Sequence, residues 1–551
     1  MKKEDIKTYF PFPTYRDNQE DISFKIIEAY EQGYDVVILR APVGFGKSPV
    51  GVAIGKILNS TYYTTPQKML QDQLAKDFLG NDFAIVKGRN NFDCNNNRNK
   101  CDYGECLLKK SKKKRSKDDP SSACDFNADE ECPYKLQRDI GRATHICTTN
   151  FSYLMSVPEK LFGKRELLIV DESHSIPNWA LNFAKTTINL YKRIEGEEIS
   201  IIDSIPEYST FEEYLTWLGK IILPLLDQKK SVLLESSESE SSEGMSIKEK
   251  KLENYLDSLI EKILNLIEDY EKVKEKWVWE IKGKGNFRSI EFQPITVGRF
   301  MQDLLWRRAD KVLLMSGTIL APSVYVEEVG LSTKKYKVIS VPSSFHYHYN
   351  PVLYYPMGKM SKDFKDDTLP RMVTKIEEII DKHGSDKGII HCNSYDIAEY
   401  IYHNLTRYRH RVIFQDRNNR QNSLREFINS KDKIFISINM NEGLDLKDDL
   451  ARYQILVKIP YPFIGDKRVK ERLFERDEQD WFNLQAVEDI CQAFGRAVRT
   501  EDDWATFYIL DESFANLWNR YKDFFTPEFI SSYKYGILLK EALESKIKFF
   551  T

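Results

Sequence analysis

The sequence of 551 residues has no long apolar run and almost no net charge. No stretch approaches the roughly 18 apolar residues of a membrane-spanning helix, and the charged N-terminus lacks the apolar segment of a secretion signal. We therefore expect a cytoplasmic protein that does not enter a membrane. The net charge is −3, so the overall charge does not indicate a nucleic-acid partner, and any such surface must be local.

Cysteines are also few, and no two of them form a CxxC pair. Of the eight, six fall between Cys94 and Cys147, and in a reducing compartment such clustering favours metal binding over disulfides. Thiolates hold both zinc and iron–sulfur clusters, but the long, uneven intervals favour a cluster. Cys147 is predicted to be an ordinary strand residue, and Cys392 and Cys491 are predicted to be core residues.

Short apolar, β-branched segments alternate with helical patterns along the chain. This alternation predicts an α/β fold with parallel sheets. At about 150 residues per domain, the length predicts three or four domains. The strand-like segments form one group before about residue 318 and another after about residue 337, which predicts two α/β lobes. The clearest of them are 36–39, 167–170, 312–315, 388–390, 434–437 and 507–510.

Two stretches depart from this alternation. Residues 90–147 are rich in Asn, Cys and Lys and have little periodicity. Residues 185–295 contain the sequence ESSESESSE at 235–243, which is predicted to be a disordered loop. Apolar residues then recur every three or four positions from Leu252 to Tyr270, which predicts a helix with one buried face.

A predicted strand at 36–40 leads into the sequence APVGFGKS, which is typical of a phosphate-binding loop. Its glycines would let backbone N–H groups approach phosphates at the start of a helix. Lys47 would reach the β- and γ-phosphates, and the Ser48 hydroxyl would bind Mg²⁺. Ala41 stands where the strict motif has glycine. The predicted loop residues are Gly44, Gly46, Lys47 and Ser48.

Two further segments complete the prediction of a nucleoside triphosphatase. The strand at 167–170 delivers two carboxylates, of which Asp171 can hold Mg²⁺ and Glu172 can orient and deprotonate a water molecule. Near the C-terminus, Arg496 and Arg499 lie three residues apart on a predicted helix, so they share a face suited to contacting phosphate. A loop, an acid pair and an arginine pair in this order predict ATP hydrolysis between two lobes.

With these segments in place, nearly the whole chain resembles the XPD/DinG family of iron–sulfur superfamily 2 DNA helicases. By this resemblance, Gln19 and Arg16 in YRDNQ would contact adenine, while Asp445 and Gln492 would belong to the nucleotide site. The matching motifs are YRDNQ at 15–19, TTP at 64–66, DESH at 171–174, SGT at 316–318, EGLD at 442–445 and QAFGRAVR at 492–499. Ser173 stands where many members have alanine.

The resemblance implies two RecA-like P-loop lobes with two insertions in the first. An iron–sulfur domain would precede the DExH box, and a mainly helical arch would be inserted between Asp171 and Ser316, which are 145 positions apart. The predicted domains are helicase domain 1 at 1–88, 148–184 and 296–336, the iron–sulfur domain at 89–147, the arch at 185–295 and helicase domain 2 at 337–551.

The family's cluster motifs, GRxN(Y/F)xC and CPY, match at Cys94 and Cys132. Cys106 and Cys124 are predicted as the other ligands of a 4Fe-4S cluster, with Cys101 as the alternative to either. A basic segment at 109–117 is predicted to be either a solvated loop or a phosphate contact.

The resemblance also implies a monomer that uses ATP and Mg²⁺ to move 5′→3′ on single-stranded DNA and to open duplex junctions, with other DNA-processing proteins as partners. Two alternatives stay open: a translocase that remodels without processive unwinding, and a cluster-bearing nucleic-acid adaptor. The residues do not choose between repair, replication-linked and mobile-element roles.

Overall fold

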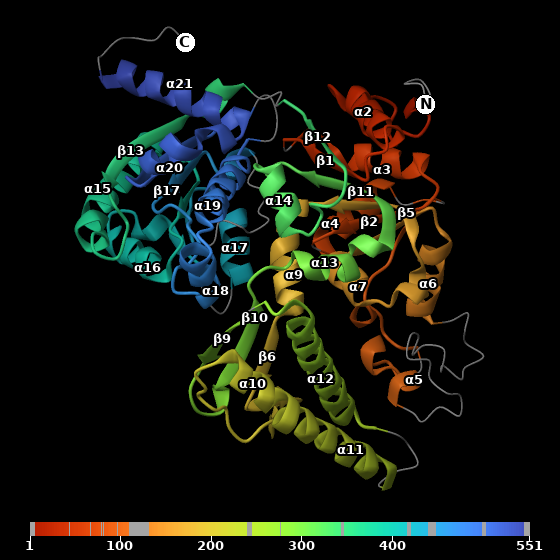
Figure 1. The fold of residues 1–551 in the computed structure, drawn as a ribbon. Helices are drawn as coiled ribbons and strands as arrows, with labels where there is room; N and C mark the ends of the chain where they lie inside the picture. The colour runs from red at the N-terminus through yellow and green to blue at the C-terminus, as the bar shows by residue number, and fades with distance from the viewer. Residues whose placement is uncertain are drawn as a thin grey trace.

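The computed structural model shows two α/β lobes side by side and an elongated unit below them (Figure 1). No helix in the described part of the chain is long and apolar enough to cross a membrane. The structure describes residues 6–42, 44–66, 68–78, 80, 82–95, 97–108, 132–239, 245–275, 277–342, 346–415, 420–438, 448–498 and 503–544.

The first lobe is built on a sheet of seven strands, every one of which runs parallel to its neighbours. This confirms the predicted parallel α/β architecture. Strand β12 belongs to this sheet, so the first-lobe sheet extends past the boundary predicted at residue 336. In spatial order the strands are β12 (Tyr336–Ser340), β1 (Val36–Arg40), β11 (Ala309–Ser316), β5 (Arg165–Asp171), β2 (Thr61–Thr65), β4 (Ile146–Asn150) and β3 (Phe83–Ile85).

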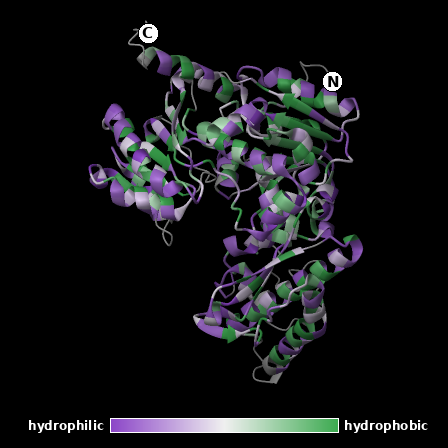
Figure 2. Cartoon of the chain, turned by 60° about the vertical axis from the view of Figure 1, so that its left-hand side comes forward, coloured by the Kyte–Doolittle hydropathy of each residue, from purple (hydrophilic) through white to green (hydrophobic). Residues whose placement is uncertain are grey.

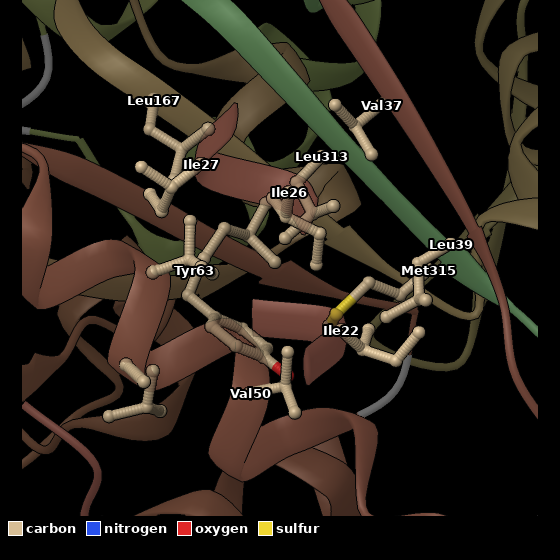
Figure 3. Packing of buried hydrophobic residues seen from close by; sticks show 14 of the residues in the cluster. Ile22, Ile26, Ile27, Val37, Leu39, Val50, Tyr63, Leu167, Leu313 and Met315 are labelled. Carbon is tan, nitrogen blue, oxygen red and sulfur yellow. The ribbon is translucent and has the colours of Figure 1, made fainter. Parts of the chain in front are cut away.

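Helices cover both faces of this sheet, as the right-handed crossovers of parallel strands require. Figure 3 shows one of these interfaces, where isoleucines of α2 and Val50 of α3 pack on residues of β1, β2, β5 and β11. In Figure 2 the central strands are largely apolar, whereas the covering helices alternate apolar and polar residues. The helices are α2 (Gln19–Glu31), α3 (Lys47–Ile57), α4 (Lys68–Phe78), α7 (Phe151–Ser156), α8 (Glu159–Phe162), α9 (Ile176–Ala184), α13 (Gly298–Leu304) and α14 (Pro322–Glu328).

The second lobe is built on six parallel strands, and this confirms the second predicted group. In spatial order they are β13 (Val352–Gly358), β18 (Thr506–Asp511), β17 (Tyr453–Leu456), β14 (Gly388–His391), β16 (Ile434–Ser437) and β15 (Val412–Phe414). Its helices are α15 (Lys365–His383), α16 (Tyr395–Asn404), α17 (Arg420–Asn429), α18 (Lys467–Lys470), α19 (Gln479–Phe494), α20 (Phe514–Tyr521) and α21 (Pro527–Glu544).

The 185–295 insertion forms the lower unit in Figure 1 and has a hydrophobic core of its own. The predicted helix over Leu252 to Tyr270 is present as part of α12, which begins with a capping box between Ser246 and Glu249. The insertion is mainly helical, as predicted, and short strands accompany its helices. Its elements are α10 (Phe211–Trp217), α11 (Leu223–Ser239), α12 (Ile247–Val273), the antiparallel sheet β6 (Thr186–Asn189), β10 (Ser289–Pro294) and β9 (Trp277–Lys282), and the hairpin of β7 (Tyr191–Ile194) with β8 (Glu197–Ser200).

One prediction within this insertion was wrong. Residues 235–243 were expected to be a disordered loop, but α11 continues through Ser239. The helix is already established by its packed first turns, and glutamate favours helix, so the first part of the Glu/Ser run extends it. Residues 240–244 lie outside the described part of the chain.

The cysteine-containing segment is placed between β3 and β4 of the first sheet. Its described elements are α5 (Glu105–Leu108) and α6 (Pro133–Ala143). It contacts the 185–295 insertion, because the Met245 N–H donates to the Leu108 carbonyl at 3.0 Å and the Lys251 ammonium lies 5.0 Å from the centre of the Tyr103 ring. The two insertions of the first lobe therefore touch each other away from the sheet.

Candidate nucleotide site and cysteine site

Three predicted site segments follow strands that are direct neighbours in the first sheet. In the order β1, β11 and β5, the strands end at Arg40, Ser316 and Asp171. Because the strands are parallel, the segments that follow them meet at one edge of the sheet. The phosphate loop, the SGT motif and the acid pair are thus brought together from positions up to 276 residues apart in the sequence (40 to 316).

The phosphate loop adopts a conformation that depends on its glycines. Gly44 and Gly46 have φ values of 84° and 81°, in the left-handed region that residues with a Cβ atom rarely adopt. Helix α3 begins at Lys47, directly after the second of them. The Lys47 Nζ donates to the Ala41 carbonyl at 3.4 Å, so it lies folded back over its own loop. This is the loop–helix arrangement predicted from the sequence.

Arg16 and Gln19, predicted to contact adenine, are bonded to this loop in the structure. The Arg16 Nη1 donates to the Gly44 carbonyl at 2.8 Å. The buried Gln19 donates from Nε2 to the carbonyls of Phe45 at 2.8 Å and Gly46 at 3.2 Å. Both side chains therefore lie at the nucleotide loop, where they set its backbone conformation.

Asp171 lies buried beside the loop. Burial raises the pKa of its carboxyl group to about 6, and the nearby negative charge of Glu172 adds to the shift while Lys47 opposes it. The Tyr63 hydroxyl donates to Asp171 Oδ2 at 3.2 Å and also interacts with the Ser48 side chain. The Asp171 carboxyl group and the Ser48 hydroxyl, which both lie at the Tyr63 hydroxyl, offer the oxygen ligands that Mg²⁺ prefers, so these residues fit the ion.

Glu172 begins a polar chain that leads away from the acid pair. Its φ of 49° places it in the left-handed region, which turns the backbone sharply after β5. His174 Nδ1 lies 3.4 Å from Glu172 Oε2 and 2.9 Å from Ser316 Oγ. Burial lowers the pKa of His174, and the charge of Glu172 opposes this shift. His174 therefore connects the DExH box to the SGT motif.

The series of polar contacts that begins at Glu172 continues into the second lobe. The Thr318 N–H donates to Ser316 Oγ at 3.1 Å, and Gln492 Nε2 donates to Thr318 Oγ1 at 3.3 Å across the seam between the lobes. Arg496 also lies near this seam, because its charge contributes to lowering the pKa of both His174 and His391.

Two predicted nucleotide-site residues, Arg499 and Asp445, lie outside the described residues. Their roles stay predictions. One position that sequence reasoning missed is Tyr63, which contacts Asp171 from strand β2; another is Tyr325, whose hydroxyl donates to the Ser173 carbonyl at 2.6 Å. Both tyrosines stand outside the motifs, so only the sheet order could have revealed them.

The cysteine segment brings Cys101 next to Cys132. A hydrogen bond with the Cys101 side chain lowers the pKa of the Cys132 thiol to about 6. Cys94 lies in the same loop, since its Sγ is 3.5 Å from the position of a Cβ built on Gly104, which follows Cys101 closely. The sequence-based ligand set had kept Cys101 only as an alternative.

These thiols have the donor chemistry of an iron–sulfur site, but the described residues contain no group of three or more potential ligands close enough to hold a metal. The side chain of Cys106, and Cys124 as a whole, lie outside the described part of the chain, so their prediction as ligands stays open. Cys147, Cys392 and Cys491 are buried, as predicted for structural residues.

Comparison with known proteins supports this arrangement. Residues 376–530 match the model of the helicase C-terminal domain family. The chain is 32% identical over 92 residues to the Fanconi anemia group J protein homolog of Gallus gallus, covering 15% of this chain and 7% of that protein. It is 34% identical over 91 residues to the regulator of telomere elongation helicase 1 homolog of Caenorhabditis elegans, covering 14% of this chain and 9% of that protein. The chain thus spans only a small part of the length of these relatives.

Solved structures match over nearly the full chain. A structure described as XPD_Helicase has a TM-score of 0.61 at 16% identity and covers 93% of this chain and 98% of its own. A structure of S. tokodaii Xpd4 has a TM-score of 0.53 at 15% identity and covers 93% of this chain and 99% of its own. These likenesses show a shared fold. In sequence, the likeness to helicases covers the matched C-terminal domain, residues 376–530, and the shorter aligned segments of 92 and 91 residues.

Proposed function

We propose that this protein is an ATP-dependent DNA helicase that moves 5′→3′ on single-stranded DNA. The observation that carries the proposal is the polar chain from Glu172 through His174, Ser316 and Thr318 to Gln492. It joins the acid that would activate water to the helix of the second lobe that would sense the nucleotide. The match of residues 376–530 to the helicase C-terminal domain family supports the same conclusion.

The residues divide the chemistry of ATP hydrolysis between the lobes. Lys47 would exchange the Ala41 carbonyl for the β- and γ-phosphate oxygens, which offer a full negative charge. Glu172 would accept a proton from the attacking water molecule as the water oxygen bonds the γ-phosphorus, and the bond from that phosphorus to the bridging oxygen would break to release ADP. Ser48 and Asp171 would hold Mg²⁺, which when bound neutralises charge on the phosphate oxygens. Arg496 would add positive charge from the second lobe.

The polar chain would make lobe closure depend on the nucleotide. With ATP present, Glu172 would accept a hydrogen bond from the attacking water molecule, and its contact with His174 would change. His174 also contacts Ser316, which accepts from the Thr318 N–H, and Thr318 accepts from Gln492 of the second lobe. A change at the acid pair is thus passed to the seam, and each hydrolysis event would move the lobes relative to each other along the strand.

The insertions would guide the DNA. We propose that residues 89–147 form an iron–sulfur domain, that residues 185–295 form an arch, and that the two enclose a passage with the first lobe. The support is that they touch through Leu108 and Met245 and through Tyr103 and Lys251. A strand drawn through such a passage would be separated from its complement. Cys94 and Cys132 would hold the cluster together with Cys106 and Cys124, or with Cys101 in place of either; the Cys106 side chain and Cys124 lie outside the described residues.

The test uses the full-length protein purified without oxygen. ATP hydrolysis is measured with and without single-stranded DNA, strand displacement is measured on duplexes with a 5′ or a 3′ tail, and iron is assayed on the same sample. We expect DNA-stimulated hydrolysis, displacement only from the 5′ tail, and bound iron. Hydrolysis without displacement would identify a translocase instead, and binding of DNA without hydrolysis would identify an adaptor. Lys47→Ala is the control for hydrolysis by this site.

A further inference from the structure

A buried group of charges joins the two lobes at the end of helix α14, away from the nucleotide residues. Glu328, the last residue of α14, accepts two hydrogen bonds from Arg472 of the second lobe, from Nη1 to Oε1 at 2.8 Å and from Nη2 to Oε2 at 2.7 Å. Arg468 Nη2 donates to the same carboxylate at 3.4 Å. The Glu328 side chain is only 9% exposed and the Arg472 side chain 4%.

This contact is well defined and costly to break. The Arg472 guanidinium also bonds Glu478 Oε2 at 2.6 Å and stacks 3.8 Å from the centre of the Trp481 ring. Burial by itself would raise the pKa of Glu328, but the charges of Arg472 and Arg468 hold that pKa below its usual value. Separating the partners would leave charges buried without compensation, which is strongly unfavourable.

Helix α14 connects this contact to the catalytic residues. It follows the SGT motif in the chain, and the hydroxyl of Tyr325, one turn before Glu328, donates to the Ser173 carbonyl beside Glu172 at 2.6 Å. A movement of the DExH box is therefore passed along one rigid helical turn to Glu328.

The contact also reaches the 185–295 insertion. Arg468 Nε donates to the carbonyl of Ile295, where that insertion returns to the first lobe, at 2.9 Å. Close by, Arg476 Nη2 bonds Glu275 Oε1 at 2.7 Å. The same short stretch of the second lobe thus holds both α14 and the base of the insertion.

We propose that Glu328 is a positioning residue that acts as the pivot between the lobes, so that hydrolysis at Glu172 is converted into a rotation about a fixed contact and into movement of the insertion. This rests on the proposed function. Because the pair resists separation, the lobes turn about it rather than separate at this point. Without the charge on Glu328, the lobes slip against each other and hydrolysis produces less directed movement.

The test is the number of DNA strands displaced per ATP hydrolysed, measured on the full-length protein. Glu328→Gln keeps the side chain's size and removes its charge. Glu327→Gln, at the exposed neighbouring position, is the matched control. We expect Glu328→Gln to keep DNA-stimulated hydrolysis within about threefold of wild type and to lower the displacement ratio at least fivefold, with Glu327→Gln unchanged. A merely structural role would lower both activities together through loss of folded protein and leave their ratio unaltered.

Arg468→Lys is the second variant, since it keeps the positive charge but loses the planar group that reaches both Glu328 and Ile295. We expect Arg468→Lys to lower the number of DNA strands displaced per ATP hydrolysed. This result supports the proposal even when Glu328→Gln does not yield folded protein. A ratio within twofold of wild type in every folded variant of the two would overturn it. If the wild-type protein hydrolyses no ATP in the presence of DNA, the proposed function is refuted, and the pivot, which rests on it, is refuted for that reason and not by the variants.

Discussion

Replacing Asp171 by asparagine should abolish ATP hydrolysis and yet stabilise the first lobe. In the nucleotide-free protein the pKa of Asp171 is raised from 3.8 to about 6, so the ionised carboxylate, which predominates at neutral pH, is unfavourable in the folded state. A difference of about two pKa units corresponds to about 3 kcal/mol at roughly 1.36 kcal/mol per unit. This is an upper bound for Asp171 alone, because repulsion from Glu172 is part of it.

The sign of the pH dependence follows from the direction of the shift. The folded carboxyl group holds its proton more tightly than the unfolded one, so this group lowers stability as pH rises from about 4 to about 6, and the loss is constant above that range. Asp171→Asn removes the charge and with it the loss. The variant should gain up to about 3 kcal/mol over wild type at pH 8 and about half as much at pH 5.

The assay is thermal unfolding in the presence of a chelator, followed by a signal from the first lobe. A gain of about 1–3 kcal/mol in a lobe of this size should raise its melting temperature by several degrees. Added Mg²⁺ should stabilise wild type but not the variant. Asp77→Asn, on the exposed side of α4, is the control and should change nothing. Equal melting temperatures of wild type and Asp171→Asn at pH 8, or a difference that does not shrink at pH 5, would refute the reasoning.

Three further predictions concern the loop, the seam and the cysteines. Gly46→Ala should reduce ATP affinity at least tenfold in a titration, because the new Cβ would stand 2.5 Å from Gln19 Nε2 at a φ of 81°; unchanged affinity would show that the loop tolerates a side chain. Gln492→Ala should leave ATP binding intact but lower DNA-stimulated hydrolysis severalfold, since the bond to Thr318 across the seam is lost; equal turnover would exclude this bond from the coupling. Cys101→Ser should lower iron content and visible absorption in anaerobically purified protein, whereas Cys147→Ser, in the buried strand β4, should not; full iron in Cys101→Ser would return the choice to Cys106 and Cys124.

The architecture could be predicted because its signals are local. Segments such as 36–39 and 434–437 are continuous apolar runs, as strands covered on both faces must be, and they became β1 and β16. The phosphate loop was equally readable, since its glycines, lysine and helix start are consecutive. By contrast, Glu328 of the seven-residue helix α14 contacts Arg472, which is 144 residues away in the sequence. No local sequence pattern predicts such a pairing.

Details of the sites depended on three-dimensional neighbours. Gln19 and Arg16 were expected at the nucleotide base, and the structure shows them bonded to carbonyls of the phosphate loop, a contact between segments more than 25 residues apart. Spacing in the sequence likewise gave no reason to rank Cys101 above Cys106. Only the fold of the 89–108 segment brings Cys101 to the Cys132 thiol at the start of α6.

The two ends of the 185–295 insertion are hydrogen-bonded neighbours, since β6 at its start pairs with β10 at its end, with Thr186 opposite Phe292. The polypeptide therefore leaves the first lobe and returns to it at nearly the same place. Such an insertion can be lengthened, shortened or replaced by a tight turn without shifting the first-lobe strands on either side of it. If the protein is the helicase proposed above, its DNA specificity can change through this insertion while the two α/β lobes stay the same.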